Sequence, residues 1–322
     1  MSTRIIHGDC REKLVSLPDQ SVHCCVTSPP YYGLRDYGVA GQIGLEPTPG
    51  AFVEEMVNLF REVRRVLRDD GTLRLNLGDS YSNGGRTTQV APTLRTATFD
   101  AASGKQAYLA NFAVRPKGDS WSKPKDLLGI PWRVAFALQA DGWYLRQDII
   151  WSKPNPMPES VTDRCTKAHE YIFLLSKNAR YYYDGESIKY ASDHSGKIAG
   201  TGPKSLSKGQ ARGANIKPTG NAKDGGFCIS PAMANKRSVW EVASQPFSEA
   251  HFATFPPALI EPCILAGCPK GGTVLDPFAG AGTTGLVADR LQRNAILIEL
   301  NPDYIKMAQQ RIHDDAPLLV TL

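Results

Sequence analysis

The chain has 322 residues, of which 42% are hydrophobic and 21% are charged, a composition typical of a globular protein with a substantial core. It contains no run of about eighteen apolar residues and no long apolar stretch near its start, so a membrane span and a signal peptide are excluded and a cytoplasmic location is expected. The seven cysteines include no C-x-x-C pair, so neither a disulfide framework nor a metal site is predicted.

The positive charge of the chain is concentrated in one segment. The net charge is +5, yet residues 185–240 alone carry nine Lys or Arg against three acids. This asymmetry favours a polyanionic partner that binds through the segment. The alternative is a solvated basic insertion without a partner.

Hydrophobic periodicity predicts alternating strands and helices along most of the chain. The predicted strands cover residues 4–9, 22–26, 72–77, 143–151, 171–175, 272–276 and 294–299. The predicted helices cover residues 11–17, 52–67, 125–140, 255–264, 283–291 and 302–312. This alternation predicts an α/β fold in which a mostly parallel, twisted sheet carries helices on both faces.

Two long stretches lack this periodicity. Residues 82–120 are polar and aperiodic, which is typical of a functional or mobile loop. Residues 185–237 contain nine glycines and few large apolar side chains, so they cannot bury a core of their own. We therefore expect one domain built from residues 1–184 and 238–322, with a basic Gly-rich insertion between its two parts.

The strand predicted at residues 22–26 runs into Thr27-Ser28-Pro29-Pro30-Tyr31. Consecutive prolines cannot continue a strand, because each lacks an N–H group and restricts the residue before it. The strand therefore ends at Ser28, in a stiff loop at the sheet edge where α/β proteins bind ligands. The hydroxyl, the carbonyl and the aromatic ring of this loop favour a site for a flat, amino-bearing base. The alternative is a Pro-rich strand exit with a packed tyrosine.

A second loop, Asp276-Pro277-Phe278-Ala279-Gly280-Ala281-Gly282-Thr283, joins a predicted strand to a predicted helix. Glycines let the backbone approach a ligand closely, and a helix N-terminus offers unpaired N–H groups. Glu299 ends the next strand, 19 residues after Gly280, where a carboxylate can accept hydrogen bonds from both ribose hydroxyls. The spacing predicts a site for a nucleoside-containing cofactor, either NAD or S-adenosylmethionine.

Together the two loops resemble those of the amino-directed DNA methyltransferases, which methylate N4 of cytosine or N6 of adenine. Ser28-Pro29-Pro30-Tyr31 is similar to their catalytic motif, whose first position is Asp, Asn or Ser, and the loop from Asp276 to Thr283 is similar to their S-adenosylmethionine loop. The catalytic motif comes first in the chain, with the basic region between the two, as in the beta group of this family. The resemblance implies a circularly permuted, Rossmann-like methyltransferase fold.

The resemblance divides the chain by role and implies further site residues. Residues 1–184 form the catalytic part, 185–237 the target-recognition insertion and 238–322 the cofactor-binding part. Asp9 is similar to the acid near the cofactor adenine. Asp79 is a candidate to bind the base edge or receive a proton; the alternative is that Asp79 caps a turn. The other implied cofactor contacts are Thr27, Phe252, Thr254, Phe255, Pro256 and Asn301. The predicted DNA contacts are Lys153, Lys204, Lys208, Arg212, Lys217, Lys236 and Arg237.

The implied reaction is methyl transfer from S-adenosylmethionine to an exocyclic amine whose lone pair is delocalised into its ring. The Ser28 hydroxyl and the Pro29 carbonyl would accept the amine hydrogens, and Tyr31 would stack on the ring, so no metal is required. The base must flip out of duplex DNA to reach this pocket. Serine at position 28 favours N4 of cytosine over N6 of adenine, which is the alternative.

The expected partner is double-stranded DNA, in a restriction-modification or epigenetic system of a prokaryote or a phage. A cognate restriction endonuclease would be a functional rather than a physical partner, and the protein would be a monomer or a homodimer. Two more distant alternatives are an NAD-dependent oxidoreductase, which has no need of the Ser28 motif, and a non-catalytic DNA-binding protein.

Two residues depart from the pattern. Arg74 occupies a predicted strand position where an apolar side chain is expected, and it would lower stability if it pointed inward. Pro262-Cys263 has the Pro-Cys context of 5-cytosine methylation, but it falls within the apolar stripe of a predicted helix and is interpreted as core.

Overall fold

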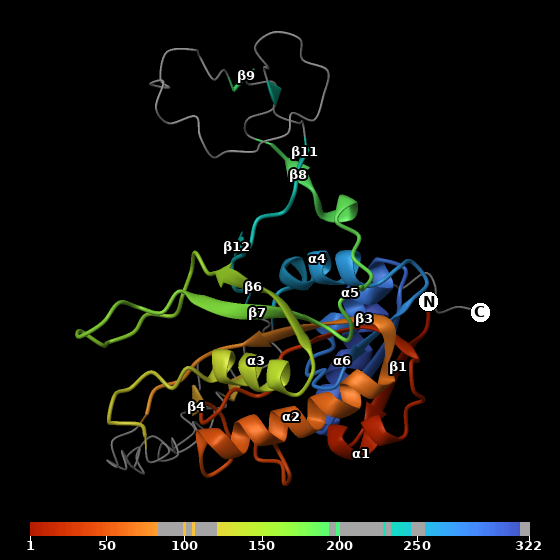
Figure 1. Ribbon diagram of the computed structural model, residues 1–322. Coiled ribbons are helices and arrows are strands. Elements are labelled where there is room, and N and C mark those ends of the chain that lie inside the picture. Colours follow the sequence, from red (N-terminus) through yellow and green to blue (C-terminus); the bar gives the residue numbers. More distant parts are fainter. Residues whose placement is uncertain are drawn as a thin grey trace, which may run out of the picture. The chain divides into compact units, whose positions relative to one another are not determined.

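The computed structural model describes residues 1–82, 99–100, 105–106, 121–192, 198–199, 228–229, 233–245 and 255–315 (Figure 1). The chain divides into two compact units. Met1–Asp184 and Ser238–Leu322 form the first unit, and Gly185–Arg237 form the second.

An eight-stranded sheet forms the centre of the first unit, in the order β1-β14-β13-β2-β3-β7-β6-β12. Its strands are β1 (Thr3–His7), β2 (Val22–Thr27), β3 (Leu67–Leu77), β6 (Tyr144–Ser152), β7 (His169–Ser176), β12 (Val239–Glu241), β13 (Thr273–Asp276) and β14 (Asn294–Glu299). Neighbouring strands of this sheet are parallel except around β7, which runs against both β3 and β6. The carboxyl ends of the parallel strands therefore lie at one edge, together with the start of β7.

Helices cover both faces of this sheet. On one face, α1 (Cys10–Val15), α2 (Pro49–Val66) and α3 (Ile130–Ala140) contribute to one hydrophobic cluster. On the other, α4 (Pro257–Gly267) and α5 (Thr283–Arg290) form a second cluster, against which Ile312 of α6 (Pro302–Asp315) packs. Figure 1 shows α2 and α3 on one side of the sheet and α4 on the other. The predicted α/β fold with a mostly parallel sheet is confirmed.

Several cysteines are buried in the core. Cys24 and Cys25 on β2 are fully buried free thiols, and they face opposite clusters because successive strand residues point to opposite faces. Cys263 is 1% exposed within α4, which confirms its interpretation as a core residue.

The helix predicted over residues 125–140 begins only at Ile130. Gly129 has a φ of +66°, a left-handed conformation that does not continue a helix. The residues before it pair instead with the segment after β3, where the Leu128 N–H donates to the Ser80 carbonyl at 2.9 Å. The apolar spacing in this stretch therefore reflects a helix preceded by a bridged loop.

Arg74 lies on β3 with only 3% of its surface exposed. It is paired with Val26 of β2, whose side chain belongs to the cluster under α4. Its Nε and Nη1 atoms have no hydrogen-bond partner among the described residues, and its guanidinium lies 5.8 Å from the ring centroid of Tyr183. Arg74 is thus a buried cation with incomplete hydrogen bonding, which costs stability.

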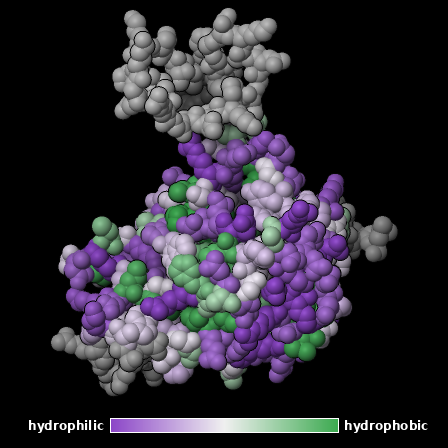
Figure 2. All heavy atoms as spheres, viewed as in Figure 1, coloured by the Kyte–Doolittle hydropathy of each residue, from purple (hydrophilic) through white to green (hydrophobic). Residues whose placement is uncertain are grey.

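The remaining described elements are short. In the second unit, a 3-10 turn (Glu186–Ile188) precedes two antiparallel pairs, β8 (Tyr190–Ala191) with β11 (Met233–Ala234) and β9 (Ile198–Ala199) with β10 (Cys228–Ile229). A further pair, β4 (Phe99–Asp100) with β5 (Lys105–Gln106), falls in the predicted loop at 82–120. None of the described helices is long and apolar enough to cross a membrane, and hydrophilic residues predominate on the face in Figure 2.

Candidate active site

A buried hydrogen bond joins the ends of β2 and β13. The hydroxyl of Thr27 donates to Asp276 Oδ1 at 2.6 Å, and that of Thr284 donates to Oδ2, also at 2.6 Å. The Phe278 N–H adds a third bond at 3.0 Å. Burial nevertheless raises the pKa of Asp276 to about 6. Thr27 and Asp276, both predicted as cofactor contacts, are therefore buried against each other and hold the Ser28 loop beside the Gly-rich turn.

The two glycines of the Gly-rich turn have different surroundings. Gly280 has a φ of +50°, and no atom lies within 4 Å of the position that a Cβ would take there. Gly282 has a φ of +75°, and a Cβ on it would lie 2.7 Å from the Cβ of Ala308 on α6. Gly280 therefore leaves open space for a ligand, whereas Gly282 allows α5 and α6 to approach closely.

Glu299 is held beside this open space by the backbone. Its Oε2 accepts the Gly280 N–H at 2.7 Å, and its Oε1 accepts the Asn301 N–H at 2.8 Å. The Leu300 N–H also bonds to the carboxylate, which still keeps acceptor capacity for a ligand. Burial raises the pKa of Glu299. Burial also raises the pKa values of Tyr37 and Tyr304, and the charge of Glu299 adds to both shifts.

These residues fit a nucleoside-containing group. The Glu299 carboxylate offers acceptors to ribose hydroxyls, and the turn at Gly280 leaves room for close approach. Tyr37 and Tyr304, both half-buried, are candidates to contact a purine. The sequence-based prediction missed both tyrosines. One lies in a Gly-rich loop and the other in the first turn of α6, and neither belongs to a recognisable motif.

Asp9 lies at the same edge, because the N–H of the preceding Gly8 donates to the Glu299 carbonyl at 2.9 Å. Its carboxylate caps α1 and forms an ion pair with Arg11 at 2.5 Å. Pro256 is buried just before α4 and the neighbouring Phe255 is half-buried. The other two predicted contacts of this segment, Phe252 and Thr254, lie outside the described residues.

Ser28 faces a group of polar side chains from separate segments. Its hydroxyl oxygen lies 3.3 Å from Asn76 Oδ1 and 3.5 Å from the Tyr31 hydroxyl. Tyr31 in turn donates to Glu170 Oε2 at 2.6 Å, and Lys153 forms an ion pair with the other Glu170 oxygen. We call Ser28, Tyr31, Asn76, Lys153 and Glu170 the Ser28 network.

The Tyr31 ring lies against the backbone after β3. A Cβ on Gly78 would stand 2.4 Å from Tyr31 Cε2, so only glycine leaves room for the ring at this position. Burial and the Glu170 charge raise the pKa of Tyr31 well above its usual value, so the phenol stays protonated and acts as a donor. Stacking of Tyr31 on a base remains a prediction.

Sequence reasoning missed Asn76 and Glu170 and gave Lys153 another role. Asn76 is 4% exposed near the end of β3, and Glu170 lies at the start of the reversed strand β7. The DNA contact predicted for Lys153 stays a prediction; within the chain its side chain is 18% exposed, pairs with Glu170 and lies 4.1 Å from the Trp151 ring centroid. A polar residue at the end of an otherwise apolar strand was the available signal for Asn76.

Asp79 has the capping contacts that were the alternative to a catalytic role. Its Oδ1 accepts the N–H groups of Ser80 and Ile130, both at 2.9 Å, and so caps the start of α3. Burial lowers the pKa of Lys167, while the charges of Asp79 and Glu170 oppose that shift, so this lysine lies close to both acids. The carboxyl edge therefore carries two acids and two lysines around the Ser28 loop.

The predicted DNA contacts in the insertion are only partly described. Lys236 is half-buried and Arg237 is exposed, and the Arg237 guanidinium lies 5.8 Å from the ring centroid of Tyr190 within the same unit. Lys204, Lys208, Arg212 and Lys217 fall outside the described residues.

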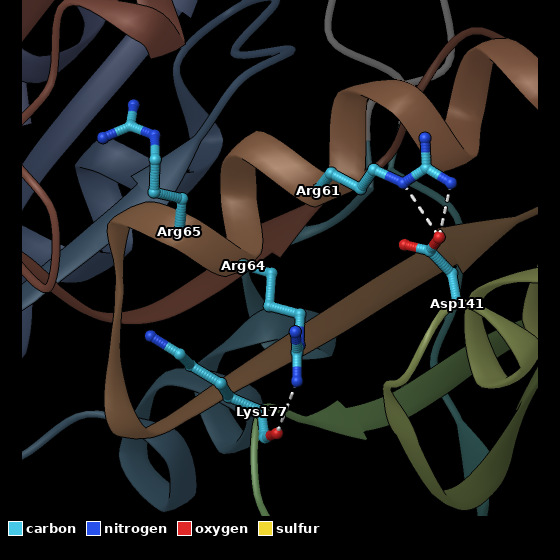
Figure 3. A pocket seen from close by; sticks show the side chains of 5 residues that line it. All are labelled: Arg61, Arg64, Arg65, Asp141 and Lys177. Carbon is cyan, nitrogen blue, oxygen red and sulfur yellow. Dashed lines mark hydrogen bonds and ion pairs between the residues drawn. The ribbon is translucent and has the colours of Figure 1, made fainter.

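A separate hollow of about 190 Å³ lies away from the predicted site residues (Figure 3). Its lining residues are Arg61, Arg64, Arg65, Asp141 and Lys177. Arg61 is paired with Asp141 at 2.6 Å, and Arg65 and Lys177 have acidic partners of their own. Because most of its cations are paired, we place the function at the carboxyl edge of the sheet.

Comparison with protein families identifies the class. A family model described as DNA methylase, which covers the N6 and N4 methyltransferases, matches residues 22–310. The chain belongs to this family: it is an amino-directed DNA methyltransferase. The resemblance drawn from the Ser28 motif and the Gly-rich turn is confirmed.

Relatives in this family are similar along nearly the whole chain. The protein is 47% identical to Type II methyltransferase M.SmaI of Serratia marcescens, over 97% of this chain and 91% of that relative. It is 45% identical to Type II methyltransferase M.Cfr9I of Citrobacter freundii, over 97% of this chain and 88% of that relative.

Solved structures share the fold. PvuII DNA methyltransferase, described as cytosine-N4-specific, matches with a TM-score of 0.61 and 18% identity, over 98% of this chain and 92% of that one. A Thermus thermophilus protein, described as a putative DNA modification methylase in complex with S-adenosyl-L-methionine, matches with a TM-score of 0.58 and 23% identity, over 98% of this chain and 96% of that one. Both matches identify the Rossmann-like methyltransferase architecture.

Proposed function

We propose that the protein transfers a methyl group from S-adenosylmethionine to the exocyclic N4 amine of a cytosine flipped out of double-stranded DNA. The observation that carries this proposal is the Ser28 hydroxyl, held 3.3 Å from Asn76 at the end of β2. The preceding residue, Thr27, is bonded to Asp276 at the start of the Gly-rich turn. This bond holds Ser28, the proposed acceptor for the amine, beside the Gly-rich turn proposed to bind the cofactor.

The residues for the cofactor are those beside Gly280. When bound, S-adenosylmethionine supplies an electrophilic methyl group. The Glu299 carboxylate accepts hydrogen bonds from its ribose hydroxyls, and the Tyr37 and Tyr304 rings contact its adenine. Asp9 completes the acidic edge next to Glu299, because Gly8 is bonded to the Glu299 carbonyl.

The residues for the base are those of the Ser28 loop. The amine lone pair is delocalised into the ring, so it becomes nucleophilic only when the nitrogen pyramidalises. Acceptors aimed at its two hydrogens, the Ser28 hydroxyl oxygen and the Pro29 carbonyl, favour that geometry. The rigid Pro29-Pro30 backbone keeps them in place, so little reorganisation is needed during the reaction.

The three segments of the chain have different roles in this proposal. Residues 1–184 and 238–322 carry the catalytic and cofactor residues, and the basic insertion at 185–237 holds DNA phosphates and reads the target. Neutralising Lys204, Lys208 and Arg212 together should weaken DNA binding and flatten its salt dependence. An unchanged salt slope would place the phosphate contacts elsewhere. As in a restriction-modification system, a cognate endonuclease would act on the same site.

Adenine is the second candidate substrate, since its N6 amine has the same chemistry and family membership includes both bases. Serine at position 28, in place of Asp or Asn, favours cytosine. Single-molecule sequencing of DNA from cells that express the protein tests the choice and maps the site. N4-methylcytosine at one recurring sequence supports the proposal, and N6-methyladenine alone would replace it with the adenine reaction.

A further inference from the structure

Hydrogen bonds in the Ser28 network have a direction that is set at Glu170. A carboxylate only accepts, so the Tyr31 hydroxyl at 2.6 Å and the Asn76 side-chain N–H at 3.3 Å both donate to Glu170 Oε2. Lys153 donates to the other oxygen. The Glu170 carboxylate, whose side chain is 15% exposed, therefore faces three donors.

The Asn76 amide has only one orientation that fits these contacts. Its Nδ2 lies 3.1 Å from the Tyr171 carbonyl as well as 3.3 Å from Glu170 Oε2. A flipped amide would set its oxygen against these two acceptors, so Oδ1 must face Ser28 and Tyr31.

This arrangement leaves one direction for the Ser28 hydroxyl. The Tyr31 hydroxyl lies 2.6 Å from Glu170 Oε2 and 3.1 Å from Asn76 Oδ1, and the shorter contact with the carboxylate takes its one hydrogen. The phenol therefore turns a lone pair toward Ser28, and Asn76 Oδ1 does the same. The single Ser28 hydrogen therefore points to these two acceptors. Its lone pairs point elsewhere and can only receive a hydrogen bond.

We propose that Asn76 and Glu170 are positioning residues that hold Ser28 as an obligate hydrogen-bond acceptor toward the base. The site thereby selects a base that carries an amine, which donates, and rejects one that carries a carbonyl at that position. This inference rests on the proposed contact between Ser28 and the amine, and it holds for an amine of cytosine or adenine.

Several ionisable groups surround the pair and enter any pH dependence. Tyr31 and Lys153 contact Glu170 directly, and Lys167 interacts with its charge. Tyr37 acts on Tyr31, and Asp79, Glu159 and Arg164 act on Lys167. Asn76 itself does not titrate, so replacing it with an acid adds one ionisable group whose effect can be isolated by comparison with the wild type.

Asn76→Asp tests the proposal most sharply. It removes the donor and sets a second carboxylate against Glu170 and the Tyr171 carbonyl, so kcat at pH 8 should fall by roughly a hundredfold. Two adjacent carboxylates share one proton as the pH falls, which restores a donor between them. The ratio of variant to wild-type kcat should therefore rise from pH 8 to pH 6, with little change in KM for DNA or in cofactor affinity.

The double variant Asn76→Asp with Glu170→Gln provides a rescue. The new amide N–H donates to the new carboxylate, so kcat at pH 8 should recover about tenfold relative to Asn76→Asp alone. A kcat ratio that is independent of pH, together with no recovery in the double variant, would contradict the proposal. A purely structural role for Asn76 predicts that result.

Glu170→Gln alone keeps the test valid if Asn76→Asp does not fold. The isosteric change should lower kcat by about tenfold at unchanged cofactor affinity, and full activity would overturn the proposal. Glu62→Gln, which breaks the ion pair with Arg65 on α2, is the matched control and should keep full activity.

A readout without turnover separates this inference from the proposed function. Mass spectrometry of digested product DNA shows which base the wild type methylates, and absence of any methylated base would sink the proposed function alone. In ¹⁵N-labelled protein, the Asn76 side-chain amide resonance, assigned by its loss in Asn76→Asp, should shift in Glu170→Gln. An unshifted resonance would contradict the hydrogen-bond direction even in an inactive protein.

Discussion

The carboxyl edge has two halves, which we propose bind the cofactor (the cofactor half, around Glu299) and the base (the catalytic half, around Ser28). They are held together in different ways. In the cofactor half, the Glu299 carboxylate is positioned by the backbone N–H groups of Gly280 and Asn301, all within one strand-turn-helix-strand segment. In the catalytic half, Ser28 is positioned by side chains from distant strands, Asn76 on β3 and Glu170 on β7. One half uses local backbone, and the other uses long-range side-chain contacts.

The two arrangements fix different properties: the first fixes the position of an acceptor, and the second also fixes the direction of the hydrogen bonds. Backbone N–H groups hold a carboxylate in place but leave its remaining lone pairs open to any donor. A network of side chains also fixes which atoms donate, because Glu170 can only accept. Changes in the cofactor half should therefore alter affinity or stability, and changes in the catalytic half should alter the rate.

The largest effect is expected for Ser28→Ala. Loss of the acceptor should lower the methyl-transfer rate by about 100- to 1000-fold, the cost of removing one aligned hydrogen-bond partner in other enzymes. Cofactor affinity should stay near wild type, because the hydroxyl of Ser28 bonds to Asn76 and Tyr31 rather than to Glu299 or Gly280. Single-turnover kinetics and isothermal titration check the two statements. Unchanged turnover would remove Ser28 from the mechanism.

Asp276→Asn should change the pH dependence of stability. The pKa of Asp276 is raised from 3.8 to about 6 in the folded chain. A raised pKa gives stability that is fully present below pH 4 and is lost as the pH rises through 6, by roughly 3 kcal/mol. The asparagine variant lacks this loss. Urea unfolding at pH 4.5 and 7.5 gives the free energy of unfolding of both proteins. If this free energy changed equally with pH in the variant and the wild type, the Asp276 pKa would not be raised.

Glu299→Ala should weaken the binding of S-adenosylmethionine by about 10- to 100-fold, because hydrogen bonds to a charged group are worth about 1.5–3 kcal/mol. The rate of the saturated enzyme should change far less. Glu54→Gln, on the exposed face of α2, is the control. Equal cofactor affinity in Glu299→Ala and the wild type would rule out the proposed ribose contact.

The smallest effect concerns Arg74, two residues before Asn76 on the same face of β3. Asn76 has partners for both its side-chain atoms, whereas Arg74 leaves Nε and Nη1 without partners among the described residues. Arg74→Met should therefore raise the free energy of unfolding by about 1–2 kcal/mol. Arg68→Met, at an exposed position of β3, should change it by less than about 0.5 kcal/mol. A destabilised Arg74→Met protein would show that the guanidinium has a partner beyond the described segments.

The same contrast explains what the sequence could predict. Asp276, Gly280 and Glu299 lie within a short segment whose strand-turn-helix pattern is visible in the spacing, so their shared edge was predictable. Glu170 was not, because its position depends on β7 running against its neighbours, and strand direction leaves no mark in the periodicity.

Two local features were also beyond the sequence. Apolar spacing alone could not reveal the late start of α3, since the left-handed conformation of Gly129 depends on its pairing context. The sequence could not decide between capping and catalysis for Asp79, because both place an acid after a strand, and its capping contacts are seen only in the structure. For Arg74, alternation along β3 placed its side chain on the face opposite Leu73 and Leu75, but it did not show that this face is buried as well.

Methylation of one duplex by the wild type and by Ser28→Ala tests the central claim most directly. The duplex carries the mapped target site, and nucleosides from its digest are quantified by mass spectrometry after a single turnover. The account predicts N4-methylcytosine from the wild type and about 1% or less of that amount from the variant in the same time. N6-methyladenine as the only product, or equal yields from both proteins, would contradict it.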